Sequence, residues 1–179
     1  MAGARIWLRF WAIAVALACC ILAPASAKVT DADVEAAFLP RFARYVTWPA
    51  AAAPKGSDAF VLCVFGNRPF AAAVQAAAHA QTADGRRIIV RYLLSPARDD
   101  GCHIAFVDGG NPQSTGQMLA AIGKRPVLTV TDGAGGPRGI IHFTVVGGRV
   151  RFFIDQEAAG SRGLTISSRL LALAVGVRK

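Results

Sequence analysis

The sequence predicts a single α/β domain of three layers, with a mixed, mainly parallel sheet, helices on both faces and a C-terminal antiparallel hairpin. Strand-like apolar runs alternate with helical segments along most of the chain, which favours parallel strands joined by helices. Near the C-terminus, Gly147-Gly148 separates two strand-like runs, which is the signal of a two-residue hairpin. The 179 residues, 54% hydrophobic and 17% charged, fit one domain and exclude a disordered protein.

The first part of the chain has the features of a secretory signal peptide. Arg5 and Arg9 precede an apolar stretch that is too short to cross a bilayer of about 30 Å, and an A-x-A cleavage motif follows. We therefore predict a cleaved signal peptide over residues 1–27 and a mature, exported domain over residues 28–179. A retained membrane anchor and lipidation at Cys19 are the alternatives, although the leucine expected three places before a lipidated cysteine is missing.

Residues 31–47 are predicted to form the first helix of the mature chain. Thr30, followed three residues later by Asp33, is typical of a capping box, and acidic side chains suit a helix N-terminus. Pro40 should bend or split this helix, and Trp48-Pro49 should end it because a residue before proline avoids helical geometry. The apolar residues at helical spacing are Val34, Ala37, Phe38, Phe42, Tyr45 and Val46.

The middle of the chain is predicted to alternate between strands and helices. Residues 60–65 are apolar throughout, which is typical of a strand buried on both faces. Residues 69–80 are rich in alanine, which favours a helix. Ser95-Pro96 is a helix-start signal and predicts one short turn over residues 96–100. The other strands are expected at 88–94, 103–107 and 127–131, and the other helix at 114–122.

The C-terminal part is predicted to complete the sheet. Residues 140–146 and 149–154 should pair as the two antiparallel strands of the hairpin. Ser167 or Ser168 can then cap a last helix.

The aromatic residues Phe42, Tyr45 and Trp48, with Arg41 and Arg44 between them, have two interpretations. Aromatic and arginine side chains are enriched at protein interfaces. The same pattern is typical of an amphipathic helix packed on a sheet, and we favour core packing.

Two cysteines remain after the predicted cleavage, Cys63 and Cys102. In an exported domain an even pair is most simply a disulfide. Two buried free thiols are the alternative. Their spacing fits no zinc motif, and we expect no metal and no cofactor.

The distribution of charge along the mature chain argues against a nucleic-acid binder. Loss of Arg5 and Arg9 leaves 18 Lys and Arg against 11 Asp and Glu, a net charge of +7. The longest basic runs are pairs, and no aromatic residues are interleaved with them to stack on bases. We expect the charge to be spread without a patch. The pairs are Arg86-Arg87, Lys124-Arg125 and Arg178-Lys179.

No enzyme signature is present, and we predict that the protein is not an enzyme. The chain lacks G-x-S-x-G, H-E-x-x-H, G-x-G-x-x-G and the Walker A pattern. His79, His103 and His142 are interpreted as structural. Cys102 and His103 are neighbours on a strand and so point to opposite faces, which argues against a thiolate–imidazole pair.

The candidate ligand or partner contacts lie in the loops that follow the predicted strands. Open α/β sheets bind ligands beyond the carboxyl ends of their strands. Asp108 and Asp132 stand there as a carboxylate pair, and Arg68 and Arg138 can meet an anion. Asn67 belongs to the first of these loops. Ordinary turns, which are rich in Gly, Pro, Asn and Asp, are the alternative.

Several sequence blocks occur in a fixed order over nearly all of the mature chain. They are residues 34–39, 42–49, 62–70, 101–106, 126–132, 139–143, 148–152 and 164–171. In that order they resemble the YfiR-like family of periplasmic regulatory proteins.

The resemblance implies a periplasmic domain in which Cys63 and Cys102 are disulfide-bonded. It also implies a regulator that represses an inner-membrane diguanylate cyclase, in cyclic di-GMP signalling, by binding its periplasmic sensor domain. An outer-membrane lipoprotein is a further expected partner, and a homodimer is a candidate assembly. The alternative is a small-ligand-binding or accessory domain that serves a histidine kinase or another membrane partner.

The chain departs from the family pattern in two places. Pro40 and Arg41 replace the usual Tyr-Asn in the first helix, on a surface available for partner contact. The C-terminal hairpin lacks the second cysteine pair of some members.

Overall fold

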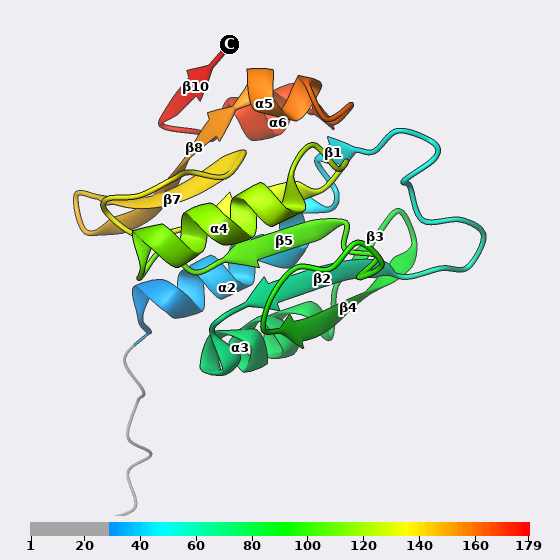
Figure 1. The fold of residues 1–179 in the computed structure, drawn as a ribbon, viewed down its shortest axis with the longest axis horizontal. Coiled ribbons are helices and arrows are strands. Elements are labelled where there is room, and N and C mark those ends of the chain that lie inside the picture. The colour runs from blue at the N-terminus through cyan, green and yellow to red at the C-terminus, as the bar shows by residue number, and fades with distance from the viewer. Residues whose placement is uncertain (1–28) are drawn as a thin grey trace, which may run out of the picture.

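The computed structural model describes residues 29–179, so the predicted signal peptide lies outside the described residues. An eight-stranded sheet forms the centre, in the order β10-β8-β7-β6-β5-β2-β4-β3 (Figure 1). Its strands are β2 (Phe60–Phe65), β3 (Thr82–Ala83), β4 (Arg86–Leu93), β5 (Ile104–Val107), β6 (Leu128–Thr131), β7 (Ile141–Val146), β8 (Arg149–Asp155) and β10 (Gly176–Arg178).

The sheet is mixed and mainly parallel, as the sequence predicts. Strands β4, β2, β5, β6 and β7 pair parallel in that order. The predicted hairpin pairs β7 antiparallel with β8, and β10 then adds parallel to β8. Gly147 and Gly148 both have positive φ, 58° and 69°, which is the backbone that a two-residue turn of this kind requires.

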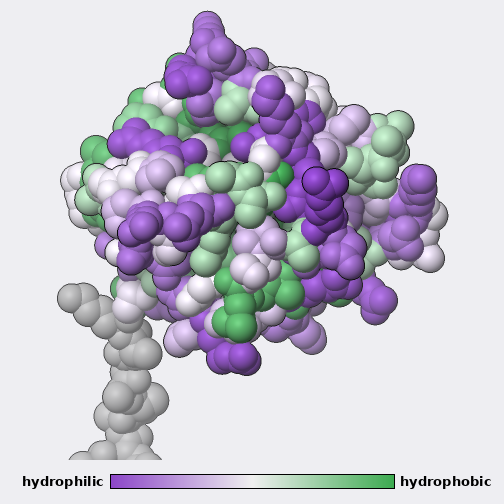
Figure 2. All heavy atoms as spheres, viewed as in Figure 1, coloured by the Kyte–Doolittle hydropathy of each residue, from purple (hydrophilic) through white to green (hydrophobic). Residues whose placement is uncertain are grey.

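Helices cover both faces of the sheet, which confirms the three-layer prediction (Figure 1). Two long helices, α2 (Asp31–Phe42) and α3 (Arg68–Ala78), pack together on one face. The opposite face carries α4 (Pro112–Ile122). Figure 2 views the molecule from the α4 side, where hydrophobic residues form small patches separated by hydrophilic ones. No helix within residues 29–179 has both the length and the apolar character needed to cross a membrane.

A hydrophobic core lies between the sheet and the α2–α3 layer. Phe42 of α2 contacts Phe143 of β7 and Phe152 of β8, with ring centroids 5.9 and 5.5 Å apart. Trp48 is also buried and packs on Phe60 at 5.2 Å. Core packing, the favoured interpretation of these aromatic side chains, is therefore confirmed for Phe42 and Trp48.

A second, smaller core lies under α4 and contains the disulfide. Strand β2 is buried along its whole length, with Leu62 and Val64 in the first core and Cys63 and Phe65 in the second. Cys63 is bonded to Cys102, with 5.8 Å between their Cα atoms, which confirms the predicted disulfide and excludes the free thiols.

The first helix is shorter than predicted. The capping box at Thr30 and Asp33 forms, but α2 ends at Phe42 rather than near residue 47. Pro40 lies within its last turn, and β1 (Val46–Thr47) pairs antiparallel with β9 (Thr165–Ile166). Pairing with the distant C-terminal segment overrides the helical periodicity of these residues.

Other differences are confined to short elements. The predicted turn at 96–100 is not helical. The predicted last helix is the short α6 (Ser168–Leu171), in which the Ser167 hydroxyl accepts the N–H of Leu170. The sequence did not predict the short elements β1, β3, β9, β10 or α5 (Gln156–Gly160).

Candidate functional site

The predicted contact residues begin where β2 and β5 end. The Asn67 side chain caps α3 by accepting the N–H of Phe70 at 3.0 Å, and it donates to the Asp108 carboxylate at 2.9 Å. The other Asp108 oxygen accepts the N–H of Gly110 at 2.7 Å. The structure thus joins the two loops through Asn67 and Asp108.

Asp132, at the end of β6, ties the next loop to the same edge. Its carboxylate accepts the N–H of Gly109 at 2.6 Å. A Cβ on Gly109 would lie 1.9 Å from the Asp132 carbonyl oxygen, so only glycine permits this approach. Burial raises the pKa of Asp132, and the Gly109 hydrogen bond partly opposes that rise. Asn67, Asp108 and Asp132 therefore form one continuous network.

Glu35 of α2 is a further acidic side chain whose pKa responds to the charges of this network, and the sequence did not single it out. It is 8% exposed, and its pKa is raised to about 7 by burial first, then by the negative charges of Asp132, Asp31 and Asp108. In sequence Glu35 looks like an ordinary acid near a helix start, so nothing marks it as buried. Within residues 29–179, no three His, Cys, Asp or Glu side chains are arranged to hold a metal ion.

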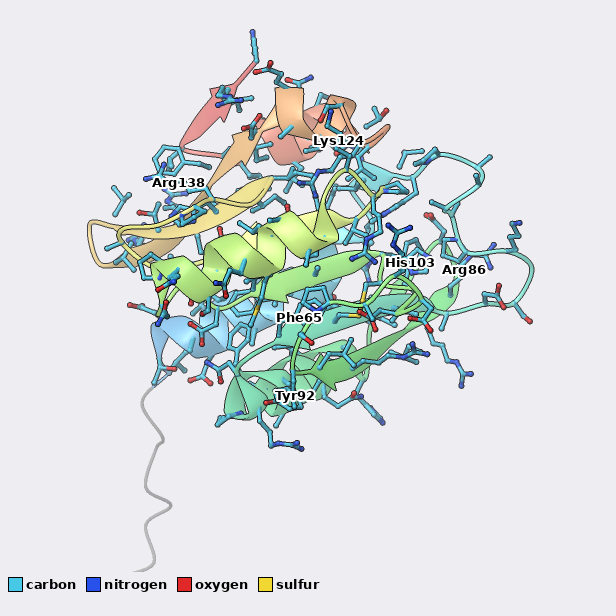
Figure 3. The ribbon with its side chains drawn as sticks, viewed as in Figure 1. Phe65, Arg86, Tyr92, His103, Lys124 and Arg138 are labelled. Atoms are coloured by element: carbon cyan, nitrogen blue, oxygen red, sulfur yellow. A yellow bond between two sulfur atoms is a disulfide. The ribbon has the colours of Figure 1, made fainter. Side chains whose placement is uncertain are left out.

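Arg68 and Arg138 do not converge on these carboxylates. The guanidinium of Arg68 lies over the Tyr92 ring of β4, 4.3 Å from its centroid, and that of Arg138 lies over the Phe153 ring of β8 at 5.5 Å. Four strands separate β4 from β8, and Figure 3 shows Tyr92 and Arg138 toward opposite edges of the sheet. Both arginines are exposed, so they offer two separate contacts rather than one anion site.

Hollows of different size lie around the sheet. One of about 250 Å³ adjoins Asp108 at the start of α4, and one of about 550 Å³ adjoins Arg138 and His142. A third, of about 750 Å³, lies at the opposite edge and is lined by Arg87 and Arg125. None of the five predicted contact residues lines the third hollow.

Two histidines, the half-buried His103 and the buried His142, make internal hydrogen bonds. His103 Nδ1 accepts the N–H of Val61 at 3.0 Å, and burial lowers the pKa of His103. His142 Nδ1 lies 2.9 Å from the Thr131 hydroxyl oxygen. Burial, followed by the charge of Arg138, lowers the pKa of His142. These contacts agree with the structural interpretation of both residues.

Comparison with known proteins identifies the family. The family model described as YfiR/HmsC-like matches residues 32–175, nearly all of the described chain. No curated protein matches the sequence. The YfiR-like family is a periplasmic regulatory family associated in general terms with cyclic di-GMP signalling. The chain belongs to the YfiR/HmsC-like family.

Proposed function

We propose that the mature chain is a non-enzymatic periplasmic regulator that represses an inner-membrane diguanylate cyclase by binding its periplasmic sensor domain. The observation that carries the proposal is the family match over residues 32–175. Export by the signal peptide over residues 1–27 is part of the proposal, and the disulfide between Cys63 and Cys102 supports it because such bonds persist in oxidising compartments.

Repression would work by differential binding. A regulator that binds the inactive conformation of the sensor more tightly shifts the population of the cyclase toward that conformation. An outer-membrane lipoprotein that sequesters the regulator would reverse the shift. Arg68 and Arg138 are the proposed partner contacts, since both are exposed beside the closed network of Asn67, Asp108 and Asp132.

The test combines deletion with capture. Deleting the gene should raise cellular cyclic di-GMP, and the tagged protein should co-purify with a diguanylate cyclase from detergent-solubilised inner membrane. Charge reversal at Arg68 and Arg138 should weaken capture, whereas Arg149→Glu, at an exposed arginine of β8 that is not a proposed contact, is the control. Unchanged cyclic di-GMP after deletion, with no cyclase captured, would refute the proposal. Capture of a histidine kinase instead would support the accessory-domain alternative.

A further inference from the structure

A hollow of about 750 Å³ lies at the end of the sheet where the parallel strands begin. Its floor is apolar and includes Val61 of β2, Ile89 of β4 and Val127 before β6. Cys102 also lines it, so the disulfide fixes one wall. Figure 3 shows this end of the molecule near His103 and Arg86. The volume is within the range of about 300–1,000 Å³ that small-molecule sites occupy.

Basic side chains from four segments surround this floor. Arg87 and Arg91 lie on β4 at positions of the same parity and therefore point to the same face of the sheet. Arg98 comes from the loop after β4, Arg125 from the segment after α4, and Lys55 from the loop before β2. Asp58 is the lining carboxylate that opposes these five positive charges.

Within residues 29–179, no carboxylate pairs with these five side chains. Among residues 29–179, the ion pairs within 4 Å are those that Arg178 makes with Asp155 and Glu157. Arg91 instead donates to the carbonyl oxygen of Asp100 at 2.9 Å, and Arg125 donates to that of Ile122 at 3.0 Å. Carbonyl oxygens orient a guanidinium group but leave its charge uncompensated.

An uncompensated group of arginines in a concave site attracts anions. The planar guanidinium group matches carboxylate and phosphate geometry, because it can donate two parallel hydrogen bonds to either. A fully hydrated anion would leave the apolar floor unused, so the floor favours a ligand that also has an apolar body.

We propose that this hollow binds a small organic anion with at least two negative charges, as a phosphate ester or a dicarboxylate. Its charged groups contact Arg87, Arg91, Arg98 and Arg125, and its apolar body lies against Val61 and Ile89. The inference goes beyond the proposed regulation and does not depend on which membrane partner the protein has.

Isothermal titration of the purified exported protein tests this site. The probes are phenyl phosphate and phthalate, which share an aromatic body and differ in their anionic groups, with inorganic phosphate and benzyl alcohol as controls. We expect saturable binding of at least one aromatic anion, weakening as salt is added. The ratio of the two affinities identifies the preferred anionic group.

Two double variants that lose the same charge distinguish binding in the hollow from non-specific attraction of anions to the basic protein. R87Q/R98Q removes two exposed lining arginines for which the described part of the chain shows no side-chain hydrogen bond, so its melting curve should stay close to wild type. R149Q/R151Q removes two exposed arginines of β8 outside the hollow. We expect about tenfold or more weaker binding in the first and a change within about twofold in the second.

Three results would overturn the proposal. These are no saturable binding of either aromatic anion, equal weakening in both double variants, and inorganic phosphate binding as tightly as phenyl phosphate. None of these results bears on repression of a cyclase, which the deletion and capture experiments test separately.

Discussion

The two ends of the parallel sheet carry opposite charges and satisfy them in opposite ways. Where the strands end, Asp132 accepts the backbone N–H of Gly109 from the neighbouring loop, and Asp108 accepts the N–H of Gly110 in its own loop, so both carboxylates are satisfied there. Where the strands begin, Arg91 and Arg125 donate to backbone carbonyl groups and still face an open hollow. The carboxylates are therefore structural where the strands end, whereas these arginines are available for binding where the strands begin.

The largest expected effect comes from the disulfide at the open edge. Cys63→Ser/Cys102→Ser removes a cross-link between residues 39 positions apart, and the chain-entropy model gives a loss of up to about 4 kcal/mol in the free energy of unfolding. Urea denaturation at equilibrium measures this loss. The reduced wild-type protein should match the variant, and a loss below about 1 kcal/mol would contradict the assigned role of the disulfide.

Gly109→Ala should break the closed edge. Its Cβ would lie 1.9 Å from the Asp132 carbonyl oxygen and 2.7 Å from that carbonyl carbon, so the two loops must separate. We expect a loss of about 2–3 kcal/mol in the free energy of unfolding, measured by urea denaturation.

The matched control for this change is Gly135→Ala. Gly135 belongs to the loop after β6, and beyond its chain neighbours no atom lies within 4 Å of the position that its new methyl group would take. Its substitution should change the free energy of unfolding by about 0.5 kcal/mol or less. If Gly109→Ala and Gly135→Ala lower the free energy of unfolding equally, the loops after β5 and β6 are not in the close contact described at Gly109.

Glu35→Gln should change how the stability of the protein depends on pH. The folded pKa of Glu35, about 7, lies above the ordinary value of 4.5, so the folded state binds more protons than the unfolded state. Its contribution to stability is full below about pH 4.5 and is lost as the pH rises through 7. At about pH 8.5 the variant should be more stable than wild type by on the order of 2 kcal/mol, and at about pH 4.5 the difference should be small.

Thermal unfolding across this pH range measures the effect. Glu157→Gln is the control, because Glu157 is an exposed glutamate whose ion pair with Arg178 is worth about 1 kcal/mol or less. If Glu35→Gln shows the same pH dependence as wild type, Glu35 does not titrate as described.

The sequence predicted best those elements whose pattern is local. The continuous apolar run gave β2 its observed bounds, Phe60–Phe65, and the paired glycines marked the hairpin. Prediction failed where distant segments decide the structure. Val46 pairs with Ile166 rather than extending α2, which no local periodicity reveals.

The candidate site was predictable in part for the same reason. Strand ends place Asp108 and Asp132 at one edge by topology alone, so their proximity could be expected. Arg87 and Arg125 occur in separate basic pairs, and only the tertiary structure places them around one hollow. The expectation of a charge without a patch was therefore wrong. The one available signal was the spacing of Arg87 and Arg91, which puts both on one face of a strand, but the predicted strand began at residue 88 and left Arg87 out.

The smallest expected effect concerns Asn67, whose side chain both caps α3 and hydrogen-bonds to Asp108. Asn67→Ala removes a helix cap, worth about 1 kcal/mol, and the hydrogen bond to Asp108. Asn111→Ala removes the corresponding cap of α4. Unlike Asn67, the Asn111 side chain is not hydrogen-bonded to Asp108 within the described residues. If the network adds to stability, urea denaturation should show a loss for Asn67→Ala that exceeds that for Asn111→Ala by about 0.5–1 kcal/mol. Equal losses would mean that Asn67 acts as a cap alone, and that the closed edge depends on Asp132 and Gly109 rather than on Asn67.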